Sequence, residues 1–260
     1  MRNAPPRGKV DKNFDTLFES FQKRIYGSTK GELRLELLQE DLGFLRDGQP
    51  LDVWDAGCGM GQMALWFASA GHRVTANDIS RKMLAEAQRR FAEAGCDAQW
   101  FEAPAQEVAR RIDRCDLVVF HAVLEWLAQP LETLEIVADR VKPGGYLSLL
   151  FYNYHGFVYN AALKGTWRIP FLLDESRWWG KGKKLTPPHP QKPETIEKWL
   201  GKHGFHLKTY TGIRVFHDYI PEALRRETDQ QALMELEKRY CREATYRSMG
   251  RYVHMLATRV

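Results

Sequence analysis

A glycine-rich turn and two acidic residues are the part of this sequence whose residue types and spacing could hold a nucleoside-type ligand. The turn follows a short apolar run and reads Asp55-Ala-Gly-Cys-Gly-Met-Gly61, and Asp78 closes the next apolar run. Glycines let the backbone approach a ligand closely, and amides at the start of the following helix can contact it. A carboxylate at the end of the neighbouring strand can accept both ribose hydroxyls. The pattern therefore predicts a ligand site at the carboxyl edge of a parallel sheet.

The glycine spacing differs from that of a dinucleotide-binding turn. The third glycine of that motif would fall at position 62, where this chain has Gln62, with Gly61 one place earlier. Asp55 could instead organise, directly or through water, an amino-acid head group that carries an ammonium. This combination resembles the class I S-adenosylmethionine-dependent methyltransferases. The alternative is a tight strand-to-helix turn with Asp55 as a buried capping residue, in a flavodoxin-like or other doubly wound domain.

The elements that must position this turn alternate between short apolar runs and helical patterns. Such alternation implies right-handed crossovers and a doubly wound sheet. We expect an α/β, Rossmann-like fold with a mostly parallel seven-stranded sheet. The expected strands are residues 52–55, 73–78, 98–102, 116–120, 146–151, 205–216 and 252–258. The expected helices are residues 62–70, 80–94, 131–141, 193–203 and 222–241.

The sequence predicts two units. Residues 1–48 should form an N-terminal helical cap, with a mobile polar start over 1–12 and two helices separated by the glycines at 27–31. Residues 49–260 should form the methyltransferase domain. Within it, residues 153–193 break the alternation and are rich in aromatics, lysines and prolines, so we expect an irregular insertion after the fifth strand that faces the ligand crevice.

Composition narrows the class of protein and the compartment. No apolar run approaches the roughly 20 residues that cross a membrane, and the start of the chain lacks the apolar core of a signal peptide. The four cysteines show no Cys-x-x-Cys spacing, so we expect neither a metal site nor a disulfide scaffold, and a cytoplasmic setting. Residues 161–208 hold ten basic and four acidic residues, which suits a polyanion such as RNA or simply a solvated face.

Several segments sharpen the resemblance to one family, the bacterial tRNA 5-carboxymethoxyuridine methyltransferases. They are Ile25-Tyr-Gly-Ser-Thr-Lys-Gly-Glu-Leu-Arg34, Phe120-His-Ala-Val-Leu-Glu-Trp126, Leu149-Leu-Phe-Tyr-Asn153 with His155-Gly156, Gly212-Ile-Arg-Val-Phe-His-Asp-Tyr219, Tyr240-Cys-Arg242 and Gly250-Arg-Tyr252. The resemblance implies transfer of a methyl group from S-adenosylmethionine to the carboxylate of 5-carboxymethoxyuridine at the tRNA wobble position, with the anticodon stem-loop as partner. Cys58 departs from the small, glycine-like residue expected in the turn.

Ten residues are candidates for binding the methyl donor. We expect Asp78 to hold the ribose, Ile79 to lie against the adenine, and Gln106 to read the adenine edge. The full set is Arg34, Asp55, Gly57, Cys58, Gly59, Asp78, Ile79, Ala105, Gln106 and His121. Arg34 and His121 are placed near the methionine moiety by the resemblance alone. Arg34 could instead pair with Glu36 or Glu40, and Gln106 could be an ordinary helix N-terminal residue.

Four residues are candidates for positioning the substrate carboxylate. Arg214 comes first, because a planar guanidinium can bind a carboxylate with two hydrogen bonds. Tyr152, Asn153 and His217 are possible hydrogen-bonding partners. Arg214 could instead be a surface strand residue or pair with Asp218, and both His217 and Tyr152 could be structural. No general base is expected, because a carboxylate is already an anion near neutral pH.

The candidates for RNA binding lie in the basic insertion. Arg168, Lys181, Lys183 and Lys184 could contact phosphates. Trp178 or Trp179 could stack on an unpaired anticodon base, or could pack as part of a lid.

Three functions compete on the sequence alone. The first is a tRNA carboxyl methyltransferase. The second is a methyltransferase for a small carboxylic acid that uses the insertion only as a lid. The third is a donor-binding RNA module without catalysis. The sequence does not indicate an oligomeric state.

Overall fold

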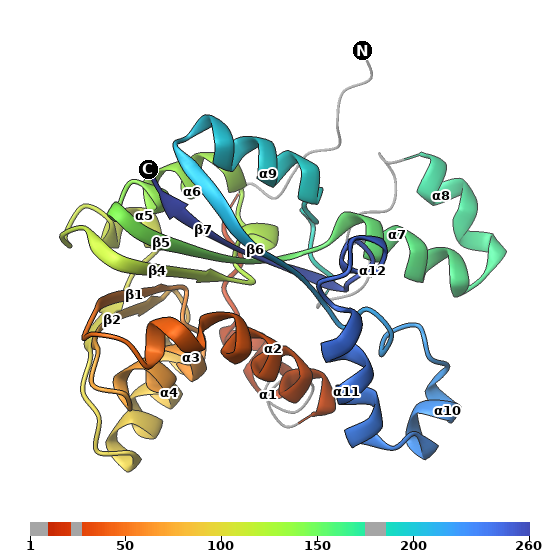
Figure 1. Ribbon diagram of the computed structural model, residues 1–260, viewed down its shortest axis with the longest axis horizontal. Coiled ribbons are helices and arrows are strands. Elements are labelled where there is room, and N and C mark those ends of the chain that lie inside the picture. Colours follow the sequence, from red (N-terminus) through yellow and green to blue (C-terminus); the bar gives the residue numbers. More distant parts are fainter. Residues whose placement is uncertain (1–9, 22–27, 175–185) are drawn as a thin grey trace.

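The computed structural model describes residues 10–21, 28–174 and 186–260 and centres on a seven-stranded sheet (Figure 1). The strands are β1 (Asp52–Ala56), β2 (Arg73–Asp78), β3 (Gln99–Glu102), β4 (Cys115–His121), β5 (Val141–Tyr152), β6 (Phe205–Ile213) and β7 (Tyr252–Arg259). Their order across the sheet is β3-β2-β1-β4-β5-β7-β6. The first five are parallel, and β7 runs antiparallel to both of its neighbours. The expected doubly wound, mostly parallel sheet is confirmed.

Helices cover both faces of the sheet (Figure 1). One face carries α2 (Thr29–Arg46), α3 (Gln62–Ala68), α4 (Arg81–Glu93) and α11 (Gln230–Tyr240). The other face carries α5 (Ala105–Val108), α6 (Pro130–Ala138) and α9 (Pro193–Lys202). Each face has its own apolar core, built around Trp54 and Phe120 on one side and around Leu42 and Phe67 on the other. The central strand β4 is nearly all apolar because both faces are covered there, whereas the edge strands β3 and β6 carry exposed polar residues.

Short elements fill the connections between these helices and strands. They are η1 (Asp15–Leu17), α1 (Phe18–Phe21), η3 (Leu124–Trp126), η4 (Thr166–Arg168), α8 (Ile169–Leu173), α10 (Glu222–Glu227) and α12 (Ala244–Arg247). None of the helices in the described parts of the chain is both long and apolar enough to cross a membrane.

The end of β6 differs from the sequence-based expectation, which continued the strand to Phe216. The strand ends at Ile213, because the chain turns at Arg214 with a φ of 63° and leaves the sheet. The buried carboxylate of Glu237, on α11, accepts the backbone N–H groups of Val215 (2.7 Å), Phe216 (3.0 Å) and His217 (2.8 Å). Amides that a strand would have paired with a neighbour are therefore paired with one side chain.

The single helix expected over residues 222–241 is two helices. α10 ends at Glu227, and α11 starts at Gln230 after a cap in which the Asp229 carboxylate accepts the N–H of Gln231 at 2.9 Å. An aspartate at this position competes with the backbone pattern of a continuous helix and instead satisfies the first amides of a new one.

The insertion after β5, residues 153–193, was expected to be irregular, but its first part is helical, while residues 186–192 are irregular. α7 (Tyr154–Leu163) begins directly at the sheet edge, capped by Asn153, whose side-chain oxygen accepts the N–H of His155 at 3.0 Å. α7 and α8 project beyond the edge of the sheet as one arm (Figure 1). The arm therefore presents a helical surface where the sequence predicted an irregular one.

The three bonds to Glu237 predict a measurable contribution to stability. Glu237→Ala should lower the free energy of unfolding by about 3 kcal/mol, because it leaves three neighbouring amides without their acceptor. Glu235→Ala, an exposed position on the same helix, should change it by less than about 0.5 kcal/mol. Urea unfolding followed by circular dichroism measures both. Equal effects of the two substitutions would contradict this role for Glu237.

Candidate functional site

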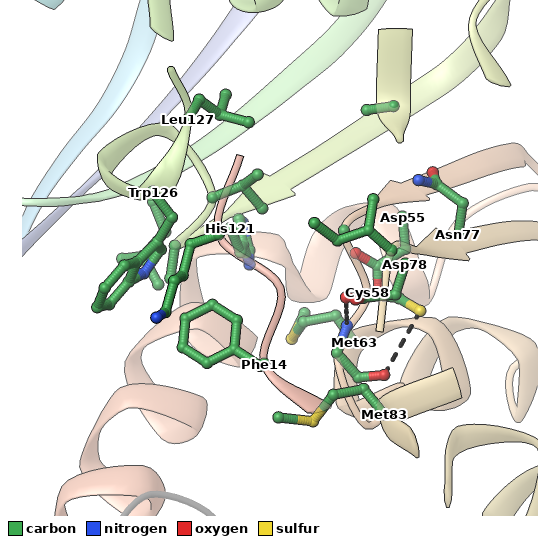
Figure 2. Close-up of a pocket in the computed structure, with 18 of the residues that line it drawn as sticks. Phe14, Asp55, Cys58, Met63, Asn77, Asp78, Met83, His121, Trp126 and Leu127 are labelled. Carbon is green, nitrogen blue, oxygen red and sulfur yellow. Dashed lines mark hydrogen bonds between the residues drawn. The ribbon is translucent and has the colours of Figure 1, made fainter. Parts of the chain in front are cut away.

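One cavity lies beyond the carboxyl ends of β1, β2 and β4, and all ten residues predicted to bind the methyl donor line it (Figure 2). They are Arg34, Asp55, Gly57, Cys58, Gly59, Asp78, Ile79, Ala105, Gln106 and His121. The carboxyl edge of the sheet brings them together although they span 88 positions of the chain, from Arg34 to His121. Their individual roles toward a ligand stay predictions.

The glycine turn is held against the next strand by its own backbone. The amides of Gly57 and Cys58 both donate to the carbonyl oxygen of Asn77, at 2.9 and 2.8 Å. Gly57 has a φ of 79°, and a Cβ placed there would come within 2.6 Å of a methyl carbon of Val123. Any side chain at this position would strain the turn and clash with the wall of the cavity, so the close approach requires glycine.

Asp55 is buried at the floor of the cavity. Its carboxylate accepts the N–H of Ala64, at the start of α3, at 3.1 Å. Burial raises the pKa of Asp55 to about 7, since no cation among the described residues offsets the loss of solvent. The carboxyl is therefore poised to ionise when a positively charged group enters beside it.

Asp78 is fixed at the end of β2 by two backbone amides. One oxygen accepts the N–H of Gly59 at 2.9 Å and the other accepts the N–H of Ser80 at 2.8 Å. Burial raises the pKa of Asp78 above its ordinary value, against the effect of these two bonds. Each oxygen keeps further acceptor capacity, so the carboxylate can receive a pair of hydroxyl groups in a fixed orientation.

The segment 11–15 crosses one side of the cavity like a strap, although the sequence suggested a mobile start. Asp11 accepts from the Gln106 side chain at 3.0 Å and from the Ala128 amide at 2.9 Å. The Phe14 ring packs edge-on against Trp126, with ring centroids 4.9 Å apart, and both rings line the cavity (Figure 2). The strap therefore shields the place predicted for the adenine.

A buried chain of hydrogen bonds fixes the ring of His121. His121 Nε2 lies 2.7 Å from Ser148 Oγ, which lies 2.8 Å from His254 Nε2. His254 Nδ1 lies 2.7 Å from the carboxylate of Asp41, which Arg242 also contacts. Burial lowers the pKa of His121 well below its ordinary value, and the neighbouring His254 and Arg34 add to this effect. The cavity is thus lined by a neutral, oriented imidazole.

A cluster of cations lies next to this cavity, and we call it the cationic cluster. It consists of Lys30, the three arginines Arg214, Arg225 and Arg251 whose charges act on Lys30, and the carboxylate of Asp218. Burial lowers the pKa of Lys30, and the charges of the three arginines lower it further. Burial alone would raise the pKa of Asp218, but Arg214, His217 and Arg251 together bring it below its usual range. Four cationic side chains and one anion leave an excess of positive charge in the cationic cluster.

The position of Arg214 decides between the structural roles that the sequence left open for this residue. Its side chain is buried, so it is not a surface strand residue, and it does pair with Asp218, at 3.2 Å from Nε. His217 is also buried, with Nδ1 3.5 Å from Asp218. The Arg34 alternative is not seen: Arg34 contacts Gln62 at 3.4 Å, while Glu36 and Glu40 both pair with Lys238.

Two tyrosines join the cationic cluster to the donor cavity. The Arg251 guanidinium lies 4.7 Å from the ring centre of Tyr152, and that of Arg214 lies 5.4 Å from the ring centre of Tyr252. The two rings meet edge-on at 5.3 Å. Burial raises the pKa of Tyr252, and the charges that influence it include Arg34, which lines the donor cavity. The two sites therefore share a wall.

Glu125 is buried in the same wall. Its carboxyl group makes no hydrogen bond of good geometry within the described residues, and burial raises its pKa to about 8. The group is therefore largely uncharged at neutral pH. An uncharged Glu125 does not cancel the positive potential of the neighbouring cationic cluster.

The structure places the remaining predicted residues apart from these two sites or leaves them undescribed. The side-chain amide of Asn153 makes hydrogen bonds within the fold. Its Nδ2 donates to the carbonyls of Ser248 and Gly250, and its Oδ1 caps α7. Arg168 lies at the end of η4, on the arm. The other RNA-binding candidates, Trp178, Trp179, Lys181, Lys183 and Lys184, lie outside the described residues.

Sequence reasoning missed several residues of these sites. Asp11 lies in the start of the chain, residues 1–12, that was predicted to be mobile, and Phe14 was predicted only as the first apolar residue of an N-terminal helix. Lys30 and Arg251 lie inside two of the segments that carried the family resemblance, Ile25–Arg34 and Gly250–Tyr252, so that resemblance was the available signal. Within the described residues no group of three His, Cys, Asp or Glu is arranged to hold a metal ion.

Comparisons with a family model and with individual proteins all find methyltransferases. Residues 53–145 match the family model described as a methyltransferase domain. The tRNA 5-carboxymethoxyuridine methyltransferase of Escherichia coli strain K12 is 38% identical over 253 residues, covering 95% of this chain and 96% of that protein. The ubiquinone biosynthesis O-methyltransferase of Bordetella avium is 34% identical, over 44% of this chain and 47% of its own length.

Among solved structures, a magnesium protoporphyrin IX methyltransferase from Synechocystis PCC 6803 with bound SAH superposes with a TM-score of 0.64. That comparison covers 95% of this chain and 96% of the other, at 20% identity. At this identity the likeness establishes the fold.

The raised pKa of Asp55 predicts a pH-dependent affinity for a cationic ligand. S-adenosylmethionine, the ligand predicted from the sequence, serves as the probe. In the free protein Asp55 is protonated below about pH 7, and a bound ammonium favours the ionised form, so binding releases a proton. The Kd should therefore rise roughly tenfold per unit as the pH falls from about 7 to 5.5.

The Asp55→Asn variant supplies the control for this prediction. Its new amide keeps an oxygen for the Ala64 N–H but cannot titrate, so its affinity should be weaker and nearly constant over the same range. Isothermal titration calorimetry measures both proteins. A slope that persists in the Asp55→Asn variant would show that another group carries the pH dependence.

Proposed function

We propose a function from one premise: this chain belongs to the family of the tRNA 5-carboxymethoxyuridine methyltransferases, which it matches over almost its whole length. We infer that it transfers a methyl group from S-adenosylmethionine to the carboxylate of 5-carboxymethoxyuridine at the tRNA wobble position and forms the methyl ester. The observation that carries this proposal is the cationic cluster beside the donor cavity. A site built to receive an anion is what distinguishes carboxylate methylation from methylation of a neutral group.

The donor cavity fits S-adenosylmethionine. Asp78 offers paired acceptors for the ribose hydroxyls, and the cradle at Gly57 leaves no room for a side chain. Asp55 offers an ionisable carboxyl for the ammonium of the methionine moiety, and the Arg34 guanidinium offers donors for its carboxylate. When bound, S-adenosylmethionine supplies an electrophilic methyl group on a positively charged sulfur.

The methyl transfer requires the protein mainly to position the substrate carboxylate against the methyl group. The substrate carboxylate is ionised near neutral pH and is its own nucleophile, so no side chain needs to remove a proton. Two reacting groups held in line react far faster than the same groups free in solution. The reaction therefore needs no general base beside the cavity.

The cationic cluster supplies the grip on the carboxylate. Arg214 is buried and its backbone is fixed by the turn that Glu237 holds, so its guanidinium has little freedom. We assign one carboxylate oxygen to Arg214 or Arg251 and leave the other open toward the methyl group. Lys30 is placed to contact the same carboxylate or the adjoining phosphate, as a compact charge on a flexible stem.

The wall shared by the two sites excludes water from the reaction. Tyr152 and Glu125 are buried in it, Tyr252 is partly buried, and Glu125 is largely uncharged at neutral pH. Charge disappears as the anionic oxygen meets the cationic donor, so a dry environment favours the transition state. His121, held neutral by its hydrogen-bond chain, adds no positive charge beside the donor.

A tRNA substrate also implies a partner and a compartment. The anticodon stem-loop is the proposed partner, and the cytoplasm, where tRNA is modified, is the proposed location. A small carboxylic acid as substrate is the second candidate, because the cationic cluster alone would bind any carboxylate.

Mass spectrometry of wobble nucleosides tests the reaction. The protein should convert 5-carboxymethoxyuridine to its methyl ester in tRNA isolated from cells that lack this activity, given S-adenosylmethionine. A panel of free carboxylic acids should accept little methyl group under the same conditions. Methylation of free acids with no change in the tRNA would replace the proposal with the second candidate.

Substitutions in the cationic cluster test the grip. Arg251→Met keeps the apolar stem and removes the charge, and Arg214→Lys keeps the charge and removes the planar fork. Each should lower kcat/KM for tRNA by roughly 10- to 100-fold, because each removes a hydrogen bond between charged groups. The Kd for S-adenosylmethionine should stay within about threefold, since neither residue lines the donor cavity.

Arg226→Met is the matched control for these variants. Arg226 is next to Arg225 in the chain, but its side chain is 78% exposed and pairs with Glu222 at the surface. It should retain kcat/KM within about twofold. Thermal unfolding of all three variants separates lost activity from lost folding. Wild-type activity in both cluster variants would rule out the proposed grip.

A further inference from the structure

Trp167 is held in an exposed position on the arm formed by α7, η4 and α8. Its side chain is 60% exposed, although tryptophan is among the most apolar residues. Single exposed apolar residues are common on protein surfaces and need no explanation. Trp167 differs because the surrounding chain fixes it in place.

Three neighbours lie against the indole ring. Gly165 has a φ of 135°, and a Cβ at this position would lie 2.9 Å from Cδ1 and 3.0 Å from Nε1 of Trp167. The guanidinium of Arg168 lies 4.7 Å from the ring centre. The Phe171 ring lies edge-on at 6.4 Å. The left-handed conformation of Gly165 thus leaves room for the exposed indole ring, which lies beside the Arg168 guanidinium.

The arm is rigidly joined to the segment that carries the cationic cluster. Asn160 on α7 donates to the backbone carbonyl of Asp218 at 2.7 Å, and Tyr159 meets Tyr219 edge-on at 5.1 Å. A Cβ at Gly156 would lie 2.4 Å from the carbonyl oxygen of Gly250, so α7 approaches the backbone next to Arg251 closely. The ten residues of α7 span about 15 Å, and Trp167 stands beyond its far end.

We propose that Trp167 and Arg168 form a stacking platform for an unpaired base of the anticodon loop, while the wobble nucleoside enters the cationic cluster. This inference rests on the proposed function and names the residues that receive the RNA around the reacting nucleoside. Bases in loops of RNA are recognised by stacking on aromatic side chains and on arginine planes. The sequence suggested Trp178 and Trp179 for the same task, and both lie outside the described residues.

The chemistry of the surface favours RNA over other occupants. Lys164 precedes Trp167 in the sequence and Arg168 follows it. Their positive charges complement a phosphate backbone. A second copy of the chain or a lipid surface would use the apolar character of the patch and would not need a planar ring.

Three substitutions at Trp167 separate these possibilities. Fluorescence anisotropy with a labelled anticodon stem-loop RNA measures affinity at fixed salt. Trp167→Phe keeps a stacking face and should bind within about threefold of wild type. Trp167→Leu keeps the apolar character without a ring and, like Trp167→Ala, should weaken binding by roughly 5- to 100-fold. Leu224→Ala, at a 55% exposed apolar residue on α10, is the control and should bind normally.

Steady-state kinetics give the second readout. Trp167→Leu should raise KM for tRNA and leave kcat at saturating tRNA and the Kd for S-adenosylmethionine within about twofold. Wild-type RNA affinity in Trp167→Leu would overturn the platform while leaving the proposed reaction intact. Loss of self-association or of binding to anionic vesicles in Trp167→Ala, with RNA affinity unchanged, would overturn the platform and assign the surface to another partner. Failure of the wild-type protein to methylate tRNA would instead refute the proposed function.

Discussion

The substrate side of this protein depends on one buried carboxylate. The Glu237 carboxylate accepts hydrogen bonds from three consecutive backbone N–H groups. These bonds hold the chain where β6 ends and the backbone turns at Arg214. They thereby position the segment that contains His217 and Asp218. α7 then docks on that segment through Asn160, and the arm that carries Trp167 follows from α7. A carboxylate without its neighbours would be costly to bury, and here the three N–H groups offset that cost. The cationic cluster and the arm are therefore consequences of the same local geometry.

The donor side could be predicted from the sequence because its signals are local. The glycine turn, Asp55 and Asp78 occupy two neighbouring strand ends, and parallel strands bring such ends to one edge. The alternation of strands and helices could equally be predicted, since the central strands are buried on both faces and form short apolar runs. His121 and Arg34 came only from the family resemblance. The structure brings both to the cavity without showing what they bind.

The remaining features depend on contacts between distant parts of the chain. β6 ends early because of a side chain on α11, which lies more than 20 positions away from the turn. The cationic cluster combines Lys30, Arg214 and Arg251 from three separate segments, and no spacing rule connects them. The strap at Asp11 has no periodic pattern and is ordered by partners near residues 106 and 128. α7 is largely apolar around its circumference, so it lacks the polar face that would have marked it as a helix.

The position of β7 between β5 and β6 sets an order of assembly for the two halves of the molecule. During translation β6 is made before β7, so it can join the sheet only after β7 has paired with β5. Arg214 follows β6 and Arg251 precedes β7, so the grip on the substrate forms in that same closing step. The parallel strands β1 to β4 need neither partner and can form the donor side beforehand. Newly made chains should thus acquire the ability to hold a methyl donor before they can hold an acceptor.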